Sequence, residues 1–263
     1  MIIRVWRAYR AEVIKALRWR QTWIGPLLLL ASVVLTVFVH PILRDNRSDY
    51  DFIALATPAT VNLLGFVLLL IWTASLIAPE IGDGSFRLFL VRPVYRHEYV
   101  LAKFLAAVSY ALLLLTVTGF FAWTFVFSFG EMNGVDVGGE LLFTHESMVW
   151  AFLQGSLLCL LPMAAGAAIA LLVSACSRSG AQAISVVLGF WLMLDMVKHP
   201  LHIDAWVFTT YLEAPWQIFI NRCDGLDASW QPMISQCFMA TMPVIFLGLL
   251  AAMLVIRRRD LSL

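Results

Sequence analysis

The chain has 263 residues, of which 61% are hydrophobic and only 13% are charged. Soluble domains carry about 25% charged residues, so this composition excludes an ordinary soluble protein and predicts an all-α integral membrane protein. The formal net charge of +1 identifies no partner, because the division of basic residues between the two sides of the bilayer is the informative quantity. We expect the lipid bilayer to surround the chain, and we expect no nucleic-acid partner.

Residues 1–21 are predicted to form an amphipathic helix. Apolar residues gather on one face, and basic residues gather on the other. Charges interleave with apolar residues over twenty positions, which is unlike a cleavable signal peptide. We interpret the segment as a connecting helix in the membrane interface; a simple basic anchor for the next span is the alternative. The basic face comprises Arg4, Arg7, Lys15 and Arg18.

Six apolar runs are long enough to cross about 30 Å of hydrocarbon as helices. Pro58 is expected to open the second span, and Pro162 with Gly166 to kink or break the fourth. The predicted spans are 23–41, 59–79, 104–129, 148–175, 181–197 and 232–256. The whole chain, 1–263, is read as one transmembrane domain.

Orientation follows from the basic residues. An even number of spans places both termini on one side, and that side takes fourteen of the eighteen Lys and Arg residues. The positive-inside rule therefore predicts that both termini are cytoplasmic. The acidic loop 130–146 and the segment 199–228 then face outward.

The outward segment 199–228 is rich in aromatic residues. We predict that it forms short re-entrant or interfacial helices before the last span. An aromatic belt at the membrane surface explains such residues without any partner. The alternative is contact with an extracytoplasmic protein, for which the candidate residues are Asp195, Trp206, Tyr211 and Trp216.

The stretch 80–103 is a long polar interruption between the second and third spans. Lipid would not tolerate its charges, so it lies in water or against another protein. Glycines let the chain turn between helices, a proline ends a short helix, and apolar side chains offer a docking surface; lying on the membrane surface is the alternative. Glu80 could form an ion pair with Arg96, Lys103 or Arg178, and a structural role is as probable as a gating one. The residues assigned to docking are Glu80, Gly82, Gly84, Phe86, Phe89, Pro93, Arg96 and Lys103.

This stretch resembles the permease subunits of type-2 ATP-binding-cassette transporters. A Glu closes the span, a Gly follows, a Pro-x-x-Arg turn comes next and a Lys opens the third span, at Glu80, Gly84, Pro93, Arg96 and Lys103. The resemblance implies that 80–103 holds a coupling helix that sits in a cleft of a separate cytoplasmic ATPase. It also implies a bacterial inner-membrane exporter containing two copies of this chain and two ATPase subunits.

The chain itself is not expected to be an enzyme. It has no Gly-x-x-x-x-Gly-Lys-Ser/Thr phosphate loop, so ATP and Mg²⁺ are expected in the partner ATPase and no cofactor in this chain. No nucleophile and base motif is present either, so no catalytic residue is assigned. His199 and His202, near Asp195 and Asp204, are explained as well by interfacial solvation as by metal binding, so no metal site is assigned.

Two other functions stay open. An ion-coupled secondary transporter also has broken helices, but these spans hold almost no ionisable residue away from their ends to carry an ion. A second possibility comes from the resemblance. Some members of the family use ATP to act on an extracytoplasmic protein, for example in metal-site maturation, without moving bulk cargo.

Overall fold

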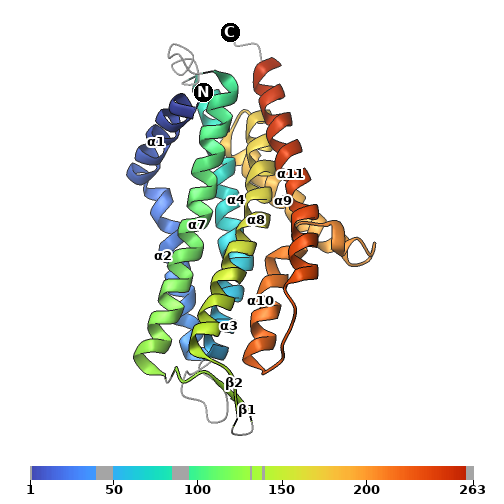
Figure 1. The fold of residues 1–263 in the computed structure, drawn as a ribbon. Coiled ribbons are helices and arrows are strands. Elements are labelled where there is room, and N and C mark those ends of the chain that lie inside the picture. The colour runs from blue at the N-terminus through green and yellow to red at the C-terminus, as the bar shows by residue number, and fades with distance from the viewer. Residues whose placement is uncertain (1, 40–49, 85–94, 131, 138–139, 259–263) are drawn as a thin grey trace.

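The apolar runs fold into long helices that pack side by side (Figure 1). The computed structural model describes residues 2–39, 50–84, 95–130, 132–137 and 140–258. Six helical stretches within these ranges are long and apolar enough to cross a membrane. The predicted all-α membrane protein is therefore confirmed. The first and last helices both reach the same end of the bundle, which we call the terminus end.

The N-terminal helix is separate from the first span. α1 (Ile2–Arg18) is followed, after a break at Trp19, by α2 (Arg20–Val39). α1 packs against the start of α7 (Arg96–Phe129), with Ala8 and Glu12 buried in the contact. The helix therefore lies against the bundle by its less basic face.

The second span is longer and less regular than predicted. It is built from α3 (Tyr50–Ala59), the π-helix η1 (Thr60–Gly65), α4 (Phe66–Ala74) and α5 (Ala78–Gly82). The expectation that Pro58 opens this span is wrong, because Pro58 lies inside α3. A proline removes one backbone donor, and the helix continues directly into the wider π-turns of η1.

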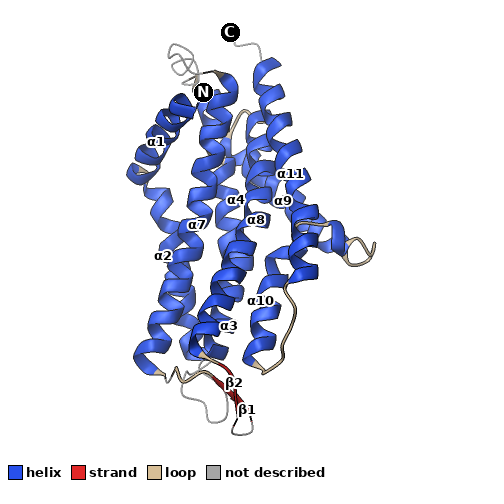
Figure 2. Cartoon of the chain, in the orientation of Figure 1, coloured by secondary structure: helices blue, strands red, loops and turns tan. Residues whose placement is uncertain are grey.

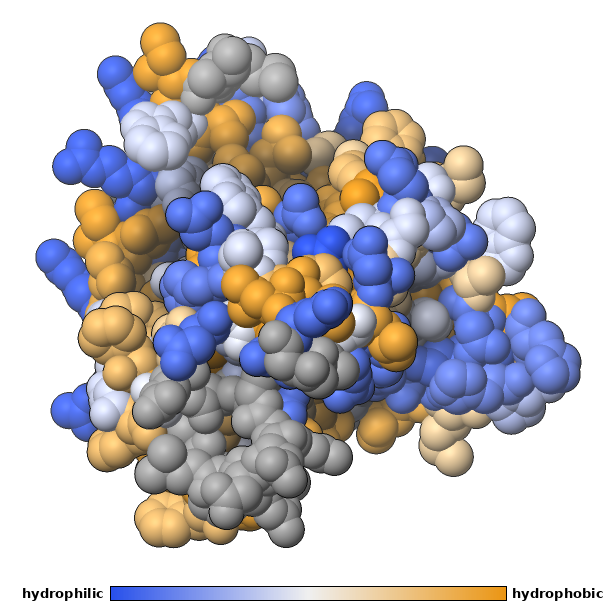
Figure 3. Space-filling model, turned by 60° about the horizontal axis from the view of Figure 1, so that its bottom comes forward, coloured by the Kyte–Doolittle hydropathy of each residue, from blue (hydrophilic) through white to orange (hydrophobic). Residues whose placement is uncertain are grey.

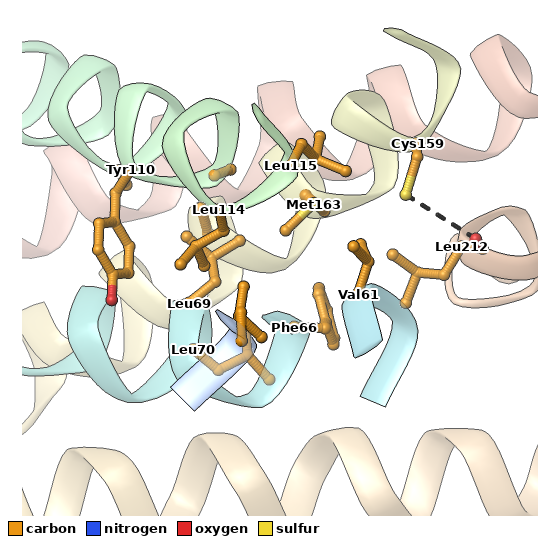
Figure 4. Packing of buried hydrophobic residues seen from close by; sticks show 14 of the residues in the cluster. Val61, Phe66, Leu69, Leu70, Tyr110, Leu114, Leu115, Cys159, Met163 and Leu212 are labelled. Carbon is orange, nitrogen blue, oxygen red and sulfur yellow. Dashed lines mark hydrogen bonds between the residues drawn. The ribbon is translucent and has the colours of Figure 1, made fainter. Parts of the chain in front are cut away.

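The centre of the bundle is α8 (His145–Cys176). It contacts α4, α7, α10 and α11. Leu69, Leu114 and Met163, from α4, α7 and α8, point toward one another in the core (Figure 4). The predicted break at Pro162 is absent, because α8 continues through it; neighbouring helices bury Pro162 and support the turn that loses a backbone bond.

A two-stranded hairpin lies at the end opposite the termini (Figure 2). β1 (Val135–Val137) pairs antiparallel with β2 (Glu140–Phe143) inside the loop predicted only as acidic. Apolar, strand-favouring residues on both sides of the turn explain the pairing. Figure 3 shows hydrophilic side chains spread over this end, around a smaller group of hydrophobic ones.

The last third of the chain adds two spans and a shorter helix between them. These are α9 (Gly180–Lys198), the 3₁₀ turn η2 (Asp204–Trp206), α10 (Thr210–Cys223) and α11 (Gln231–Arg258). α10 packs on α8 and α3, near the end opposite the termini (Figure 1). It is an integral part of the bundle at that end.

Candidate functional site at the terminus end

The second span is interrupted just before it ends. Residues 75–77 form turns between α4 and α5, because Pro79 cannot donate a backbone bond. The buried hydroxyl of Ser174, on α8, compensates for the interruption. It accepts from the backbone N–H groups of Ile77 (3.2 Å) and Ala78 (2.9 Å), and it donates to the carbonyl oxygen of Ala74 (2.6 Å). α8 thus holds the break in one conformation.

A buried cluster of charges lies beside this break. The Nζ atom of Lys103, on α7, contacts Glu80 Oε1 at 2.9 Å and Glu12 Oε2 at 3.2 Å. It also donates to the carbonyl oxygen of Leu76 in the break at 2.9 Å. The Lys103 side chain is completely buried. One ammonium group therefore joins α1, α5, α7 and the break between α4 and α5.

Two further side chains complete what we call the Lys103 cluster: Glu12, Lys15, Glu80, Tyr99 and Lys103. Lys15 forms an ion pair with Glu80, and the Tyr99 hydroxyl donates to the same carboxylate. Burial lowers the pKa of Lys15, but the hydrogen bond and negative charge of Glu80 oppose this and leave the pKa raised above its usual value. The contribution of Lys15 to stability is thus present at neutral pH and is lost only as the pH rises through this raised pKa.

A second contact fixes the start of α7. Arg4 Nε lies 3.3 Å from the buried carboxylate of Glu98, and its guanidinium group stacks over the ring of Tyr95. Glu98 also accepts from the backbone N–H of Tyr95 at 3.1 Å. This bond satisfies a free donor at the beginning of the helix. α1 is therefore held at both of its ends by residues of α7 or α5.

Close backbone packing joins α5 to the turn after α8. A Cβ atom built on Gly82 would lie 2.5 Å from the carbonyl oxygen of Arg178, and one on Gly180 would lie 3.2 Å from the ring of Pro79. Both glycines thus allow an approach that a side chain would block. Gly84 adopts a φ of 69°, in the left-handed region that favours glycine.

The structure brings together only part of the predicted docking set. Glu80 and Lys103 form an ion pair, which is one of the three pairings proposed for Glu80. Arg96 instead donates to the carbonyl oxygens of Ile256 (2.9 Å) and Arg257 (2.7 Å) at the end of α11. On α1, Arg7 and Arg18 are exposed. Phe86, Phe89 and Pro93 lie outside the described residues.

Sequence reasoning missed Glu12 and Tyr99. Glu12 is the only acidic residue among the first 44, and it lies one turn after Ala8 on the face that packs against α7. A single carboxylate on a basic helix was the available signal. Tyr99 carried no such signal in the sequence, because it lies one turn before Lys103 in a region already interpreted as polar.

The residues predicted to contact an extracytoplasmic protein are divided between surface and core. Asp195 pairs with Lys198 at 2.6 Å, and Trp206 is 76% exposed. Tyr211 and Trp216 are buried between α10 and its neighbours, and the Tyr211 hydroxyl donates to the carbonyl oxygen of Ala205. Burial leaves Tyr211 and Trp216 no surface to offer a partner, because their rings fill the core that α10 closes.

The geometry of the Lys103 cluster suits a structural role in holding α1, α5 and α7 together. Each carboxylate in it contacts an ammonium group, and no serine or cysteine nucleophile belongs to it. A comparison with family profiles matches residues 6–204 to the ABC-2 family transporter protein, and no curated protein matches the chain. The matched range covers most of α1 and the first five spans, including the Lys103 cluster. The chain therefore belongs to the ABC-2 family of transporter membrane proteins.

Proposed function

We propose that this chain is the membrane-spanning subunit of an ATP-driven exporter, and that a separate cytoplasmic ATPase docks on the segment 80–103. The observation that carries the proposal is the Lys103 cluster. Glu80 and Lys103 stand at the two ends of this segment, and they contact each other directly. A push on the segment would therefore act on both flanking spans together.

The cluster also explains how such a push would spread. Separating a buried ion pair leaves a charge without a partner at a cost of about 3–5 kcal/mol, so the pair resists opening. Glu12 and Lys15 extend the same network to α1. Under this proposal α1, α5 and the start of α7 move as one unit when the ATPase closes.

We infer further that two copies of this chain assemble with two ATPase subunits. α9 supports this arrangement, because Val186, Phe190 and Met193 are exposed apolar residues on one side of it. Such a face suits either lipid or a second copy. The basic residues at the terminus end support cytoplasmic termini in a bacterial inner membrane.

The docking assignment is tested by replacing Phe86 and Phe89 together with Asp. The chain is purified in mild detergent from its native membrane, and copurifying proteins and ATPase activity are measured. We expect a cassette ATPase in equal amount with the unaltered chain, and its loss from the double variant. The matched control is Phe129→Asp, an exposed residue at the opposite end of α7. Equal ATPase recovery from both variants would reject docking on 80–103.

A second function, action on an extracytoplasmic protein, is favoured by exposed apolar residues at the other end. Leu141 and Leu142 on the hairpin are each about half exposed. They lie beyond or near the ends of spans, where a partner protein could cover them. A soluble outward-facing protein in the same purification, lost on Leu141→Asp, would support this function.

A further inference from the structure

Two cavities adjoin next to Trp19, the residue between α1 and α2. The first, of about 210 Å³, is lined mainly by polar and aromatic residues of α1 and of the chain around α5. The second, of about 460 Å³, is lined mainly by apolar residues of α2, α4 and α9. They share four lining residues: Trp19, Trp72, Ser75 and Pro79. Together they form one space with a charged part and an apolar part.

This space lies where spans begin and end. α2 begins at Arg20, the second span ends at Gly82 and α9 begins at Gly180, and each point is within two residues of the cavity lining. The charged part is therefore at the level of lipid headgroups, and the apolar part extends toward the hydrocarbon. Ile24, which is half exposed, lines the apolar part, so that part opens on the outer surface of α2.

The charged part has an excess of carboxylates. Among the described residues, Glu12, Glu80 and Asp83 line it, against one lining cation, Lys15. Lys103 behind the wall neutralises one more charge, which leaves an excess of one negative charge among the described residues. Asp83 is exposed to the cavity and forms no ion pair with a described residue. A ligand group that carries positive charge and several N–H donors would complement this wall.

From this complementarity we propose that the joined cavities bind a phospholipid with a primary-ammonium headgroup, from the leaflet at the terminus end. The ammonium group donates to Asp83, and one acyl chain lies along Ile24, Ile71 and Ile184. An anionic headgroup would meet the unbalanced carboxylate, and a quaternary ammonium group has no N–H to donate. The inference does not rest on the proposed ATPase docking, because it uses only the cavity.

Native mass spectrometry of the purified full chain tests the proposal. The chain is titrated with ethanolamine, choline and glycerol phospholipids that carry identical acyl chains. We expect the ethanolamine lipid to bind at the lowest concentration. Asp83→Asn keeps the shape of the wall and should reduce this preference roughly two- to fivefold, the range of an exposed ion pair. Glu140→Gln, an exposed carboxylate on the hairpin, should leave the preference unchanged.

The apolar part is tested by Ile184→Trp, which fills the cavity, against Leu35→Trp, an exposed position on α2 that lines neither cavity. Ile184→Trp should weaken all three lipids, whereas Leu35→Trp should weaken none. Equal binding of the three lipids to the unaltered chain would overturn the proposal. So would an unchanged preference in Asp83→Asn, or equal effects of the two tryptophan variants.

Discussion

Lys103 makes more contacts between separate elements than its sequence position suggested. Its ammonium group touches two carboxylates and a carbonyl oxygen, each from a different part of the chain. A lysine near the start of a span is ordinarily explained as a snorkelling residue that keeps its charge in water. Here the side chain is buried, so its charge serves the protein interior.

Replacing Lys103 with Met should destabilise the chain by about 3 kcal/mol or more, because Glu12 and Glu80 would keep buried negative charge with one cation fewer. Thermal unfolding of the purified variant in detergent measures the loss. The double variant, Glu12→Gln with Lys103→Met, should be more stable than the single Lys103→Met variant. The reason is that the Glu12 carboxylate, which would have lost its ammonium partner, is no longer present. A Lys103→Met chain as stable as the unaltered one would contradict the role given to the cluster.

The pairing of Glu80 with Lys103 was one of three that the sequence left open, because Arg96 and Arg178 also lie near the ends of spans on the same side. The involvement of Glu12 and Tyr99 could not be predicted from the sequence. It depends on how α1 lies against α7, and that packing angle is set by side chains far apart in the chain. Arg96 illustrates the same limit, since its partners are backbone carbonyls about 160 residues away.

Among the elements, the broken second span is the one that most needs support from outside itself. Its backbone groups between α4 and α5 lose helical partners, and those of Ile77 and Ala78 are buried, where each unsatisfied group is costly. The hydroxyl of Ser174 supplies the missing partners from α8. The break is therefore a property of two helices.

Ser174→Ala should leave the N–H groups of Ile77 and Ala78 without this acceptor, at a cost of about 1–3 kcal/mol for each. Hydrogen exchange followed by mass spectrometry should show faster exchange in α5, together with a lower unfolding temperature. Ser185→Ala is the control, because that exposed hydroxyl only donates to a carbonyl oxygen of its own helix. If both variants exchange alike in α5, Ser174 does not support the break.

Helix positions were predictable from apolar runs because hydrocarbon thickness fixes their minimum length. The interruptions were not. Pro162 and Pro79 both lie near apolar residues. α8 continues through Pro162, whereas the helix of the second span is interrupted just before Pro79. The difference comes from neighbours: helices surround Pro162, whereas a serine hydroxyl from α8 stabilises an open turn before Pro79.

The whole molecule has distinct ends, and a native cysteine distinguishes them. Cys176 is exposed at the terminus end of α8, while Cys159, Cys223 and Cys237 are buried. A membrane-impermeant maleimide should therefore label Cys176 only when it has access to the cytoplasmic side. In intact cells the unaltered chain should stay unlabelled until the membrane is permeabilised.

The control for this labelling is Cys176→Ser carrying Glu140→Cys on the hairpin, which should react in intact cells. Labelling of the unaltered chain in intact cells, with no labelling of the hairpin variant, would reverse the orientation inferred from the basic residues. It would also place the segment 80–103 where no cytoplasmic ATPase could reach it.

The bonds from Arg96 to the last carbonyl oxygens of α11 have a practical consequence for anyone who handles this protein. They hold the end of the last helix against the first turn of α7, which lies within the segment 80–103. Arg4 holds the other terminus close to the same turn. A bulky fusion partner at either terminus would therefore crowd the surface at which we expect the ATPase. Fluorescent reporters belong instead in the hairpin at the far end.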